Sequence, residues 1–190
     1  MNRNLPSKHG SGIRISLLCT AVLGGLLTAL LLGRGPASPA PFAQTLPKPW
    51  TAVGSTGVVD EASLSTFAFG TTEIGFKAGA SSTKIVARYN VTNTFDNNAN
   101  PNKPGWTTME MGSNAPLNTI VTARLFEVKA CDQSQVLLCT ANNRSSDHPC
   151  AKCTINGTID FTSHLYYVEV TLDRTSVNNS PPSMYTLRIF

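Results

Sequence analysis

The chain has 190 residues, of which 41% are hydrophobic and 14% are charged, and its formal net charge is +4. The basic residues of the first 34 positions supply that whole excess, so the remainder of the chain is formally neutral. A nucleic acid or an anionic membrane surface requires basic side chains clustered on the folded protein. The sequence therefore predicts no nucleic-acid partner, and membrane contact only through the N-terminal segment.

Residues 1–34 have the order of features that an export signal has. Arg3, Lys8 and Arg14 precede residues 15–33, which carry no charge. A basic region followed by an apolar run is typical of a signal peptide. At about 1.5 Å per residue the run could also cross about 30 Å of hydrocarbon. We predict a signal that is either cleaved before Thr45 or retained as an anchor, with the remainder of the chain outside the cytoplasm in both cases.

Residues 35–49 contain five prolines, most of them separated by small residues. Proline fixes φ and removes a backbone donor, so this composition predicts an extended, solvated spacer rather than part of a core. Residues 50–190 then remain, and their number is typical of one domain.

Short stretches with period-2 alternation of apolar residues run through residues 50–190. They cover residues 64–69, 73–76, 85–91, 107–111, 120–129, 136–140, 155–161, 166–172 and 185–189. Nowhere do apolar residues recur at helical spacing over three turns. The pattern predicts an all-β protein, an antiparallel β-sandwich or jelly-roll-like single domain.

Two of these stretches place large side chains on both faces of the expected sheet. In residues 120–129, Phe126 and Val128 lie on the face opposite the main apolar series, which predicts a central strand or one packed beneath another layer. Tyr166 and Tyr167 are consecutive, so they point to opposite faces and only one of them can belong to the core.

The cysteines Cys131, Cys139, Cys150 and Cys153 fall within 23 residues. An even number in an exported chain favours two disulfides over free thiols. A predicted strand ends two residues before Cys131 and another starts directly after Cys153, so these two could meet at one end of the sheet. We predict that Cys131 pairs with Cys153, with Cys139 and Cys150 paired inside that loop.

A metal site is the alternative for the same cysteines. His148 precedes the Cys-x-x-Cys of Cys150 and Cys153, a combination that zinc sites use. It would support an extracytoplasmic hydrolase or another metal-dependent enzyme centred on His148 and the cysteines. Neither His148 nor His164 lies in a nucleophile-elbow or metalloprotease motif. The sequence therefore predicts no catalytic residue and no cofactor.

Asp96, Asn98 and Asn100 offer oxygens at the 1, 3, 5 spacing with which calcium loops begin. The pattern then breaks, because Pro101 stands where the turn glycine should be and Thr107 where the bidentate glutamate should be. The residues remain a candidate calcium site, beside the simpler interpretation of an Asn-rich loop that bonds to its own backbone.

Trp106 follows this loop and is a candidate for binding a sugar. An exposed tryptophan stacks well on an apolar ring face. Asn98, Asn100 and Asn102 could supply hydrogen bonds to hydroxyl groups beside it. The alternative is that Trp106 closes one end of the core, which is common for a tryptophan at the start of a strand.

Together these features predict an exported or membrane-tethered β-sandwich that acts as a binding or structural module of the cell envelope or surface. A glycan or an envelope or surface protein would be its partner. The enzyme centred on His148 and the cysteines is one alternative, and a subunit of a surface assembly is the other.

Overall fold

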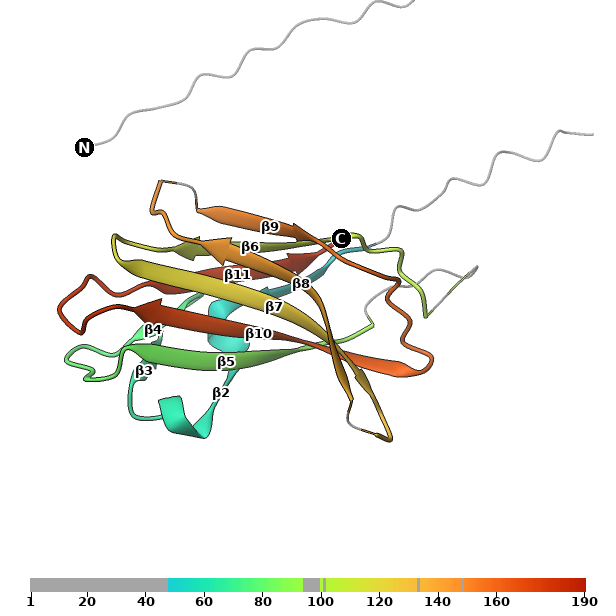
Figure 1. Cartoon of the computed structure of the whole chain (residues 1–190), viewed down its shortest axis with the longest axis horizontal. Helices are drawn as coiled ribbons and strands as arrows, with labels where there is room; N and C mark the ends of the chain where they lie inside the picture. Colours follow the sequence, from blue (N-terminus) through green and yellow to red (C-terminus); the bar gives the residue numbers. More distant parts are fainter. Residues whose placement is uncertain (1–47, 94–99, 101, 133, 148) are drawn as a thin grey trace, which may run out of the picture. The chain divides into compact units, whose positions relative to one another are not determined.

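The structure is a computed structural model that describes residues 48–93, 100, 102–132, 134–147 and 149–190. In these residues two antiparallel sheets form a β-sandwich, which confirms the predicted fold class (Figure 1). Two short 3-10 helices, η1 (Gly54–Thr56) and η2 (Glu61–Ser63), interrupt the strands near the start. Within the described ranges, no helix is long and apolar enough to cross a membrane.

The first sheet has six strands. They are β1 (Trp50–Val53), β3 (Phe67–Phe69), β4 (Ile74–Phe76), β6 (Thr108–Asn114), β9 (Cys150–Thr154) and β11 (Ser183–Ile189). Their order is β3-β4-β11-β6-β9, and β1 pairs with β11 beyond the end of β4. This six-stranded sheet therefore has β9 at one edge and the short strands β1, β3 and β4 toward the other.

The second sheet has five strands, in the order β2-β5-β10-β7-β8. They are β2 (Val58–Val59), β5 (Lys84–Val91), β7 (Thr119–Lys129), β8 (Gln135–Asn143) and β10 (His164–Arg174). The long strand β10 pairs with β5 over eight residues and with β7 over eleven, without interruption. This five-stranded sheet is the more regular of the two.

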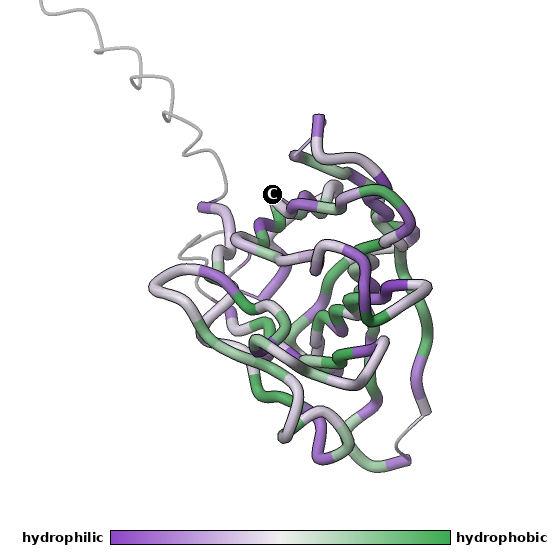
Figure 2. Tube along the Cα trace, turned by 90° about the vertical axis from the view of Figure 1, so that its left-hand side faces the viewer, coloured by the Kyte–Doolittle hydropathy of each residue, from purple (hydrophilic) through white to green (hydrophobic). Residues whose placement is uncertain are grey.

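The core lies between the sheets and is built from the alternation seen in the sequence. On β10, Val168, Val170 and Leu172 are completely buried, and their neighbours on β5 and β7 point the same way. Figure 2 shows hydrophobic and hydrophilic positions alternating along the tube. Because side chains in a strand alternate between faces, burying one face leaves the other to solvent.

The strand predicted for residues 155–161 is wrong. Ile155 and Ile159 are buried as the alternation required. However, the strand of this region is β9, which ends at Thr154. The segment after it is a loop, in which Gly157 has a φ of 107° that an L side chain rarely adopts. The alternation correctly marked buried positions, but the backbone that carries them is irregular.

β11 differs from its prediction in one detail. Tyr185, Leu187 and Ile189 were expected on the inner face, but Met184 takes the first of these positions and is completely buried. The pairing of β11 with β6 shifts at Tyr185, which therefore leaves the core side. A β-bulge inserts one residue into a strand, so the residues before it point to the opposite face from the one that uninterrupted alternation predicts.

Candidate functional site

An apolar cluster lies on the outer face of the five-stranded sheet, the face turned away from the core. We call it the face cluster; its members are Phe126 and Val128 on β7, Leu137 on β8, and Leu165 and Tyr167 on β10. The strand register places them side by side, because Tyr167, Phe126 and Leu137 form one cross-strand row, and Leu165 and Val128 belong to the next. Their sequence neighbours Tyr166, Leu125 and Val168 are buried on the opposite face.

Two aromatic rings form the centre of the face cluster. The rings of Phe126 and Tyr167 are stacked, with centroids 5.0 Å apart and planes inclined by 17°. The Tyr167 hydroxyl donates a hydrogen bond of 2.8 Å to Oε1 of Gln135. Gln135 lies on β8, which is two strands away from β10. The backbones of two such strands are about 10 Å apart, so the Tyr167 side chain extends across β7 to reach Gln135. Burial raises the pKa of Tyr167.

Two of the three aliphatic members of the face cluster are strongly exposed. Leu165 is 61% exposed and Leu137 is 49% exposed. A single exposed leucine is ordinary on a protein surface, but apolar side chains that adjoin one another around an aromatic pair form a contiguous patch. Such patches mark surfaces that bind something. This outer face is therefore the candidate binding site.

Two carboxamide side chains flank the aromatic row. Asn90 on β5 is exposed and lies directly opposite Tyr167 in the strand register. Gln135 lies beyond Phe126 on β8 and is held by the Tyr167 hydroxyl. A carboxamide both donates and accepts hydrogen bonds. The face cluster thus combines an apolar ring surface with neutral polar groups at two of its sides.

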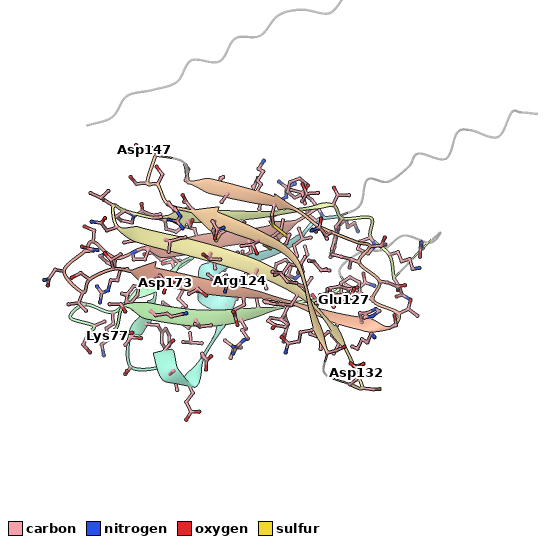
Figure 3. The ribbon with its side chains drawn as sticks, in the orientation of Figure 1. Lys77, Arg124, Glu127, Asp132, Asp147 and Asp173 are labelled. Atoms are coloured by element: carbon pink, nitrogen blue, oxygen red, sulfur yellow. A yellow bond between two sulfur atoms is a disulfide. The ribbon has the colours of Figure 1, made fainter. Side chains whose placement is uncertain are left out.

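The neighbouring row of the same face is charged but internally balanced. Arg88 contacts Asp60 at 3.3 Å and Glu169 at 3.1 Å. Arg124 contacts the other oxygen of Glu169 at 3.7 Å, and its position near the middle of the sheet is seen in Figure 3. Exposed ion pairs such as these contribute little to stability. Their effect here is that two guanidinium groups and two carboxylates cancel each other beside the face cluster.

Trp106 is not part of an exposed site, which corrects the sugar-stacking prediction. Its side chain is 2% exposed, and its indole N–H donates to the backbone oxygen of Lys48 at 2.9 Å. Its ring packs edge-on against Phe161, with centroids 6.0 Å apart. The alternative, that Trp106 closes one end of the core, is confirmed. Of the asparagines expected beside it, Asn100 is exposed and Asn102 is half-buried.

The candidate calcium site lies mostly beyond what the structure describes. Asp96 and Asn98 are outside the described residues, and so no geometry joins them to Asn100. Among the residues that are described, no three His, Cys, Asp or Glu side chains are grouped to hold a metal ion. Calcium binding at Asp96, Asn98 and Asn100 stays a prediction.

The structure also corrects the cysteine pairing. Cys139 is bonded to Cys153, with Cα atoms 5.8 Å apart, whereas Cys131 and Cys150 are free and exposed. The predicted pairs, Cys131 with Cys153 and Cys139 with Cys150, assumed that Cys153 precedes a strand. Cys153 instead lies inside β9 and Cys139 inside β8, both directed toward the interior. The disulfide consequently joins the edge strands of the two sheets.

The zinc interpretation loses its ligand set with this pairing. Cys139 and Cys153 are bonded to each other, and His148 lies outside the described residues. Cys131 and Cys150 lie on opposite sides of the disulfide along the strands. Figure 3 shows their near neighbours Asp132 and Asp147 at opposite ends of the sandwich. The two free thiols therefore cannot share one metal ion within a single chain.

His164 makes local contacts at the start of β10. Its Nδ1 lies 2.8 Å from the Ser163 hydroxyl, and its Nε2 lies 3.7 Å from a Glu127 oxygen. The other Glu127 oxygen accepts a hydrogen bond of 3.1 Å from the Tyr166 hydroxyl. These contacts tie β10 to β7 beside the face cluster.

The chain matches no known family model and no curated protein. Its fold is similar to the CBM36-1 domain of a multidomain xylanase from the hindgut metagenome of Trinervitermes trinervoides, with 8% identity and a TM-score of 0.39 over 75% of this chain and 97% of that one. It is also similar to the low-affinity xylan-binding module CBM86 from Roseburia intestinalis, with 11% identity and a TM-score of 0.39 over 75% and 93%. A chain of infectious bursal disease virus, Gx strain, gives 9% identity and a TM-score of 0.33 over 75% and 31%. Likeness at this level says nothing about the ligand of this chain.

The function must consequently be argued from the residues of this chain alone. Sequence reasoning identified Phe126, Val128 and Tyr167 as large side chains on a second face. It assigned Phe126 and Val128 to a central or covered strand and gave Tyr167 no function. The signal was present in the alternation. β7 is an interior strand with β10 on one side and β8 on the other, as one of the two predicted alternatives had it, but among the described residues its outer face is partly open to solvent.

Proposed function

We propose that the domain binds a neutral glycan on the outer face of its five-stranded sheet. The observation that carries the proposal is the stacked pair Phe126 and Tyr167, flanked by exposed leucines and by the carboxamides of Asn90 and Gln135. A sugar ring has an apolar face and a rim of hydroxyl groups. An aromatic surface with neutral hydrogen-bonding groups beside it matches both parts.

The charges of this face favour a neutral ligand over a charged one. Arg88 and Arg124 are already paired with Asp60 and Glu169 in the row beside the face cluster. A charged ligand would have to displace one of these pairs to gain a partner. A neutral ligand can lie over the row without that cost.

The proposal includes export, for which the sequence pattern of residues 1–34 is the main support. The bond between Cys139 and Cys153 agrees with it, because disulfides persist mainly in oxidising compartments. Residues 35–49 would then act as a spacer that holds the sandwich away from its point of attachment, if the signal is retained. The glycan would accordingly be one that occurs at the cell surface or outside the cell.

Affinity electrophoresis through gels that contain a neutral soluble polysaccharide tests the proposal, with xylan, a β-glucan and amylopectin as separate probes. We expect retardation in at least one gel and its loss in the Tyr167→Ala variant. Stacking contributes on the order of 1 kcal/mol, so affinity should fall roughly fivefold. Phe126→Ala should act in the same direction, because it removes the ring on which Tyr167 rests.

Phe69→Ala is the matched control. Phe69 is an aromatic residue with 43% exposure, stacked edge-on against Phe67 on β3 of the other sheet. It should not change the retardation. Equal losses in Phe69→Ala and Tyr167→Ala, or no retardation by any neutral polysaccharide, would overturn the proposal. A dimer in solution that Tyr167→Ala dissociates would also overturn it, because it would assign the face cluster to a second copy of the chain.

A further inference from the structure

A hollow lies beside the six-stranded sheet, and Asn90 of β5 is the one residue that it shares with the proposed glycan site. Its volume is about 640 Å³ and it lies beside β1. Its lining includes Trp50, Thr51, Asn90, Glu110, Thr186 and Arg188. A volume of this size accommodates a small molecule.

A missing side chain at Gly112 leaves room for the side chain of Thr186, which lines the hollow. Gly112 on β6 pairs with Thr186 on β11, directly beside the row of Glu110 and Arg188. A Cβ atom at Gly112 would lie 2.5 Å from the Thr186 hydroxyl oxygen, so no larger residue fits there without a shift. The Thr186 hydroxyl oxygen therefore lies over Gly112. Thr186 as a whole is exposed.

One cross-strand row supplies the charge of the hollow. Thr51, Arg188, Glu110 and Lys152 follow one another across β1, β11, β6 and β9. Lys152 contacts the Glu110 carboxylate at 2.8 Å. In the described part of the chain no carboxylate pairs with Arg188. The row therefore carries one positive charge in excess, and it is located at the guanidinium group that lines the hollow.

The guanidinium group of Arg188 is also held in position. Its Cζ lies 4.5 Å from the centre of the Phe190 ring. A cation over an aromatic ring is attracted to it, which limits the positions that the long side chain visits. Thr51 on β1 is the pairing partner of Arg188. Thr186 lies two residues before Arg188 on β11. Arg188, Thr51 and Thr186 thus line the same hollow.

We infer that this hollow binds a hydroxylated carboxylate, and that a uronic acid residue is the chemical class it fits. The planar guanidinium group of Arg188 can donate two parallel hydrogen bonds to a carboxylate. The hydroxyl groups of Thr51 and Thr186 and the carboxamide of Asn90 can bond to the ligand hydroxyls. This inference does not rest on the proposed neutral-glycan site, since Arg188, Thr51 and Thr186 belong to the six-stranded sheet and the ligand has a different charge; Asn90 borders both sites.

NMR titration of the oxidised domain with sodium glucuronate at low ionic strength tests the inference, with glucose and acetate as separate probes. We expect saturable shifts of the Thr51, Thr186 and Arg188 amides with glucuronate, weaker shifts with acetate and none with glucose. Arg188→Gln should weaken glucuronate binding roughly tenfold or more, because a charge-assisted hydrogen bond is lost. Thr51→Val keeps a β-branched residue in β1 and should weaken binding several-fold.

Arg144→Gln is the matched control, since Arg144 is an exposed arginine away from the hollow. It removes the same charge and should leave glucuronate binding unchanged. Equal weakening by Arg144→Gln and Arg188→Gln would overturn the inference and indicate general charge attraction. Glucose shifting the same amides as strongly as glucuronate would overturn it as well, and would point to a neutral ligand in the hollow. Retardation in neutral polysaccharide gels bears on the face cluster alone, so the two proposals can fail separately.

Discussion

Two aromatic clusters lie close together in this domain and differ in what surrounds them. At one end of the core, Trp106, Phe161 and Tyr166 form a chain of edge-on contacts, and Trp106 and Tyr166 are almost fully buried. On the outer face, Phe126 and Tyr167 are stacked and half-exposed. Tyr166 and Tyr167 are consecutive, so strand alternation alone assigns one to each cluster. Aromatic content therefore does not indicate binding; the side of the sheet decides whether a ring stabilises the fold or remains available to a ligand.

Truncating the buried cluster should have the largest effect on stability. We expect Trp106→Ala to lower the free energy of unfolding by about 3–5 kcal/mol, because it leaves a cavity at the end of the core. It also leaves the Lys48 carbonyl without its indole donor. Urea denaturation followed by circular dichroism measures the change. Tyr167→Ala should cost clearly less, since its ring is partly exposed; an equal loss would contradict the division between the two clusters.

Removal of the disulfide should have the next largest effect, and it should act more on the face cluster than on the buried one. Cys139 and Cys153 are separated by 14 positions, and closing a loop of that length contributes about 3 kcal/mol in the chain-entropy treatment. The bond anchors β8, the edge strand that carries Leu137 and Gln135. We expect the Cys139→Ala/Cys153→Ala double variant to be less stable by about this amount.

Hydrogen exchange of the same double variant shows where the loss is located. The amides of β8 should exchange faster relative to those of β10, which keeps pairing partners on both sides. Uniform acceleration across β8 and β10 would mean that the disulfide stabilises the whole sandwich and does not specifically support the edge of the face cluster.

The sequence was sufficient for the parts of the fold that depend on local alternation. The strands β5 and β10 were predicted almost to their ends, because each buries one face completely along most of its length. The loop with Ile155 and Ile159 shows the limit of the same signal. Alternation reports which residues are buried, whereas the backbone conformation between them depends on glycine and on partners far away in sequence.

The residues of the face cluster could not be predicted as a group, because contacts between strands far apart in the sequence bring them together. The register of β7 against β8 and β10 decides that Phe126, Leu137 and Tyr167 meet in one row, and nothing near these residues in the sequence encodes it. The disulfide pairing failed for a related reason, since it depends on which edge strands of the two sheets face each other. The apolar second face of residues 120–129 was visible, but one sequence could not tell a covered strand from an exposed binding face.

The smallest effect concerns the hydroxyl groups of the two consecutive tyrosines. The Tyr166 oxygen accepts the Asp160 N–H at 2.7 Å and its hydroxyl lies 3.1 Å from Glu127, whereas the Tyr167 hydroxyl bonds only to the exposed Gln135 among the described contacts. Tyr166→Phe should lower the free energy of unfolding by about 1 kcal/mol at neutral pH. Tyr167→Phe should change it less, because water can replace the lost bond.

The pH dependence of stability gives a second test of Tyr166. Burial raises the pKa of Tyr166 from 10.0 to about 12. Between these values the unfolded chain has lost the proton and the folded chain retains it, so the unfolded state binds fewer protons and stability falls as pH rises. The contribution of Tyr166 is therefore complete below pH 10 and is lost as pH approaches 12. Tyr166→Phe should make this alkaline decline shallower, although the buried Tyr89, whose pKa burial also raises, keeps part of it. Urea denaturation of the unsubstituted protein and of Tyr166→Phe on either side of pH 10 measures the difference. Parallel declines would show that the titration of Tyr166 does not contribute to the alkaline loss of stability.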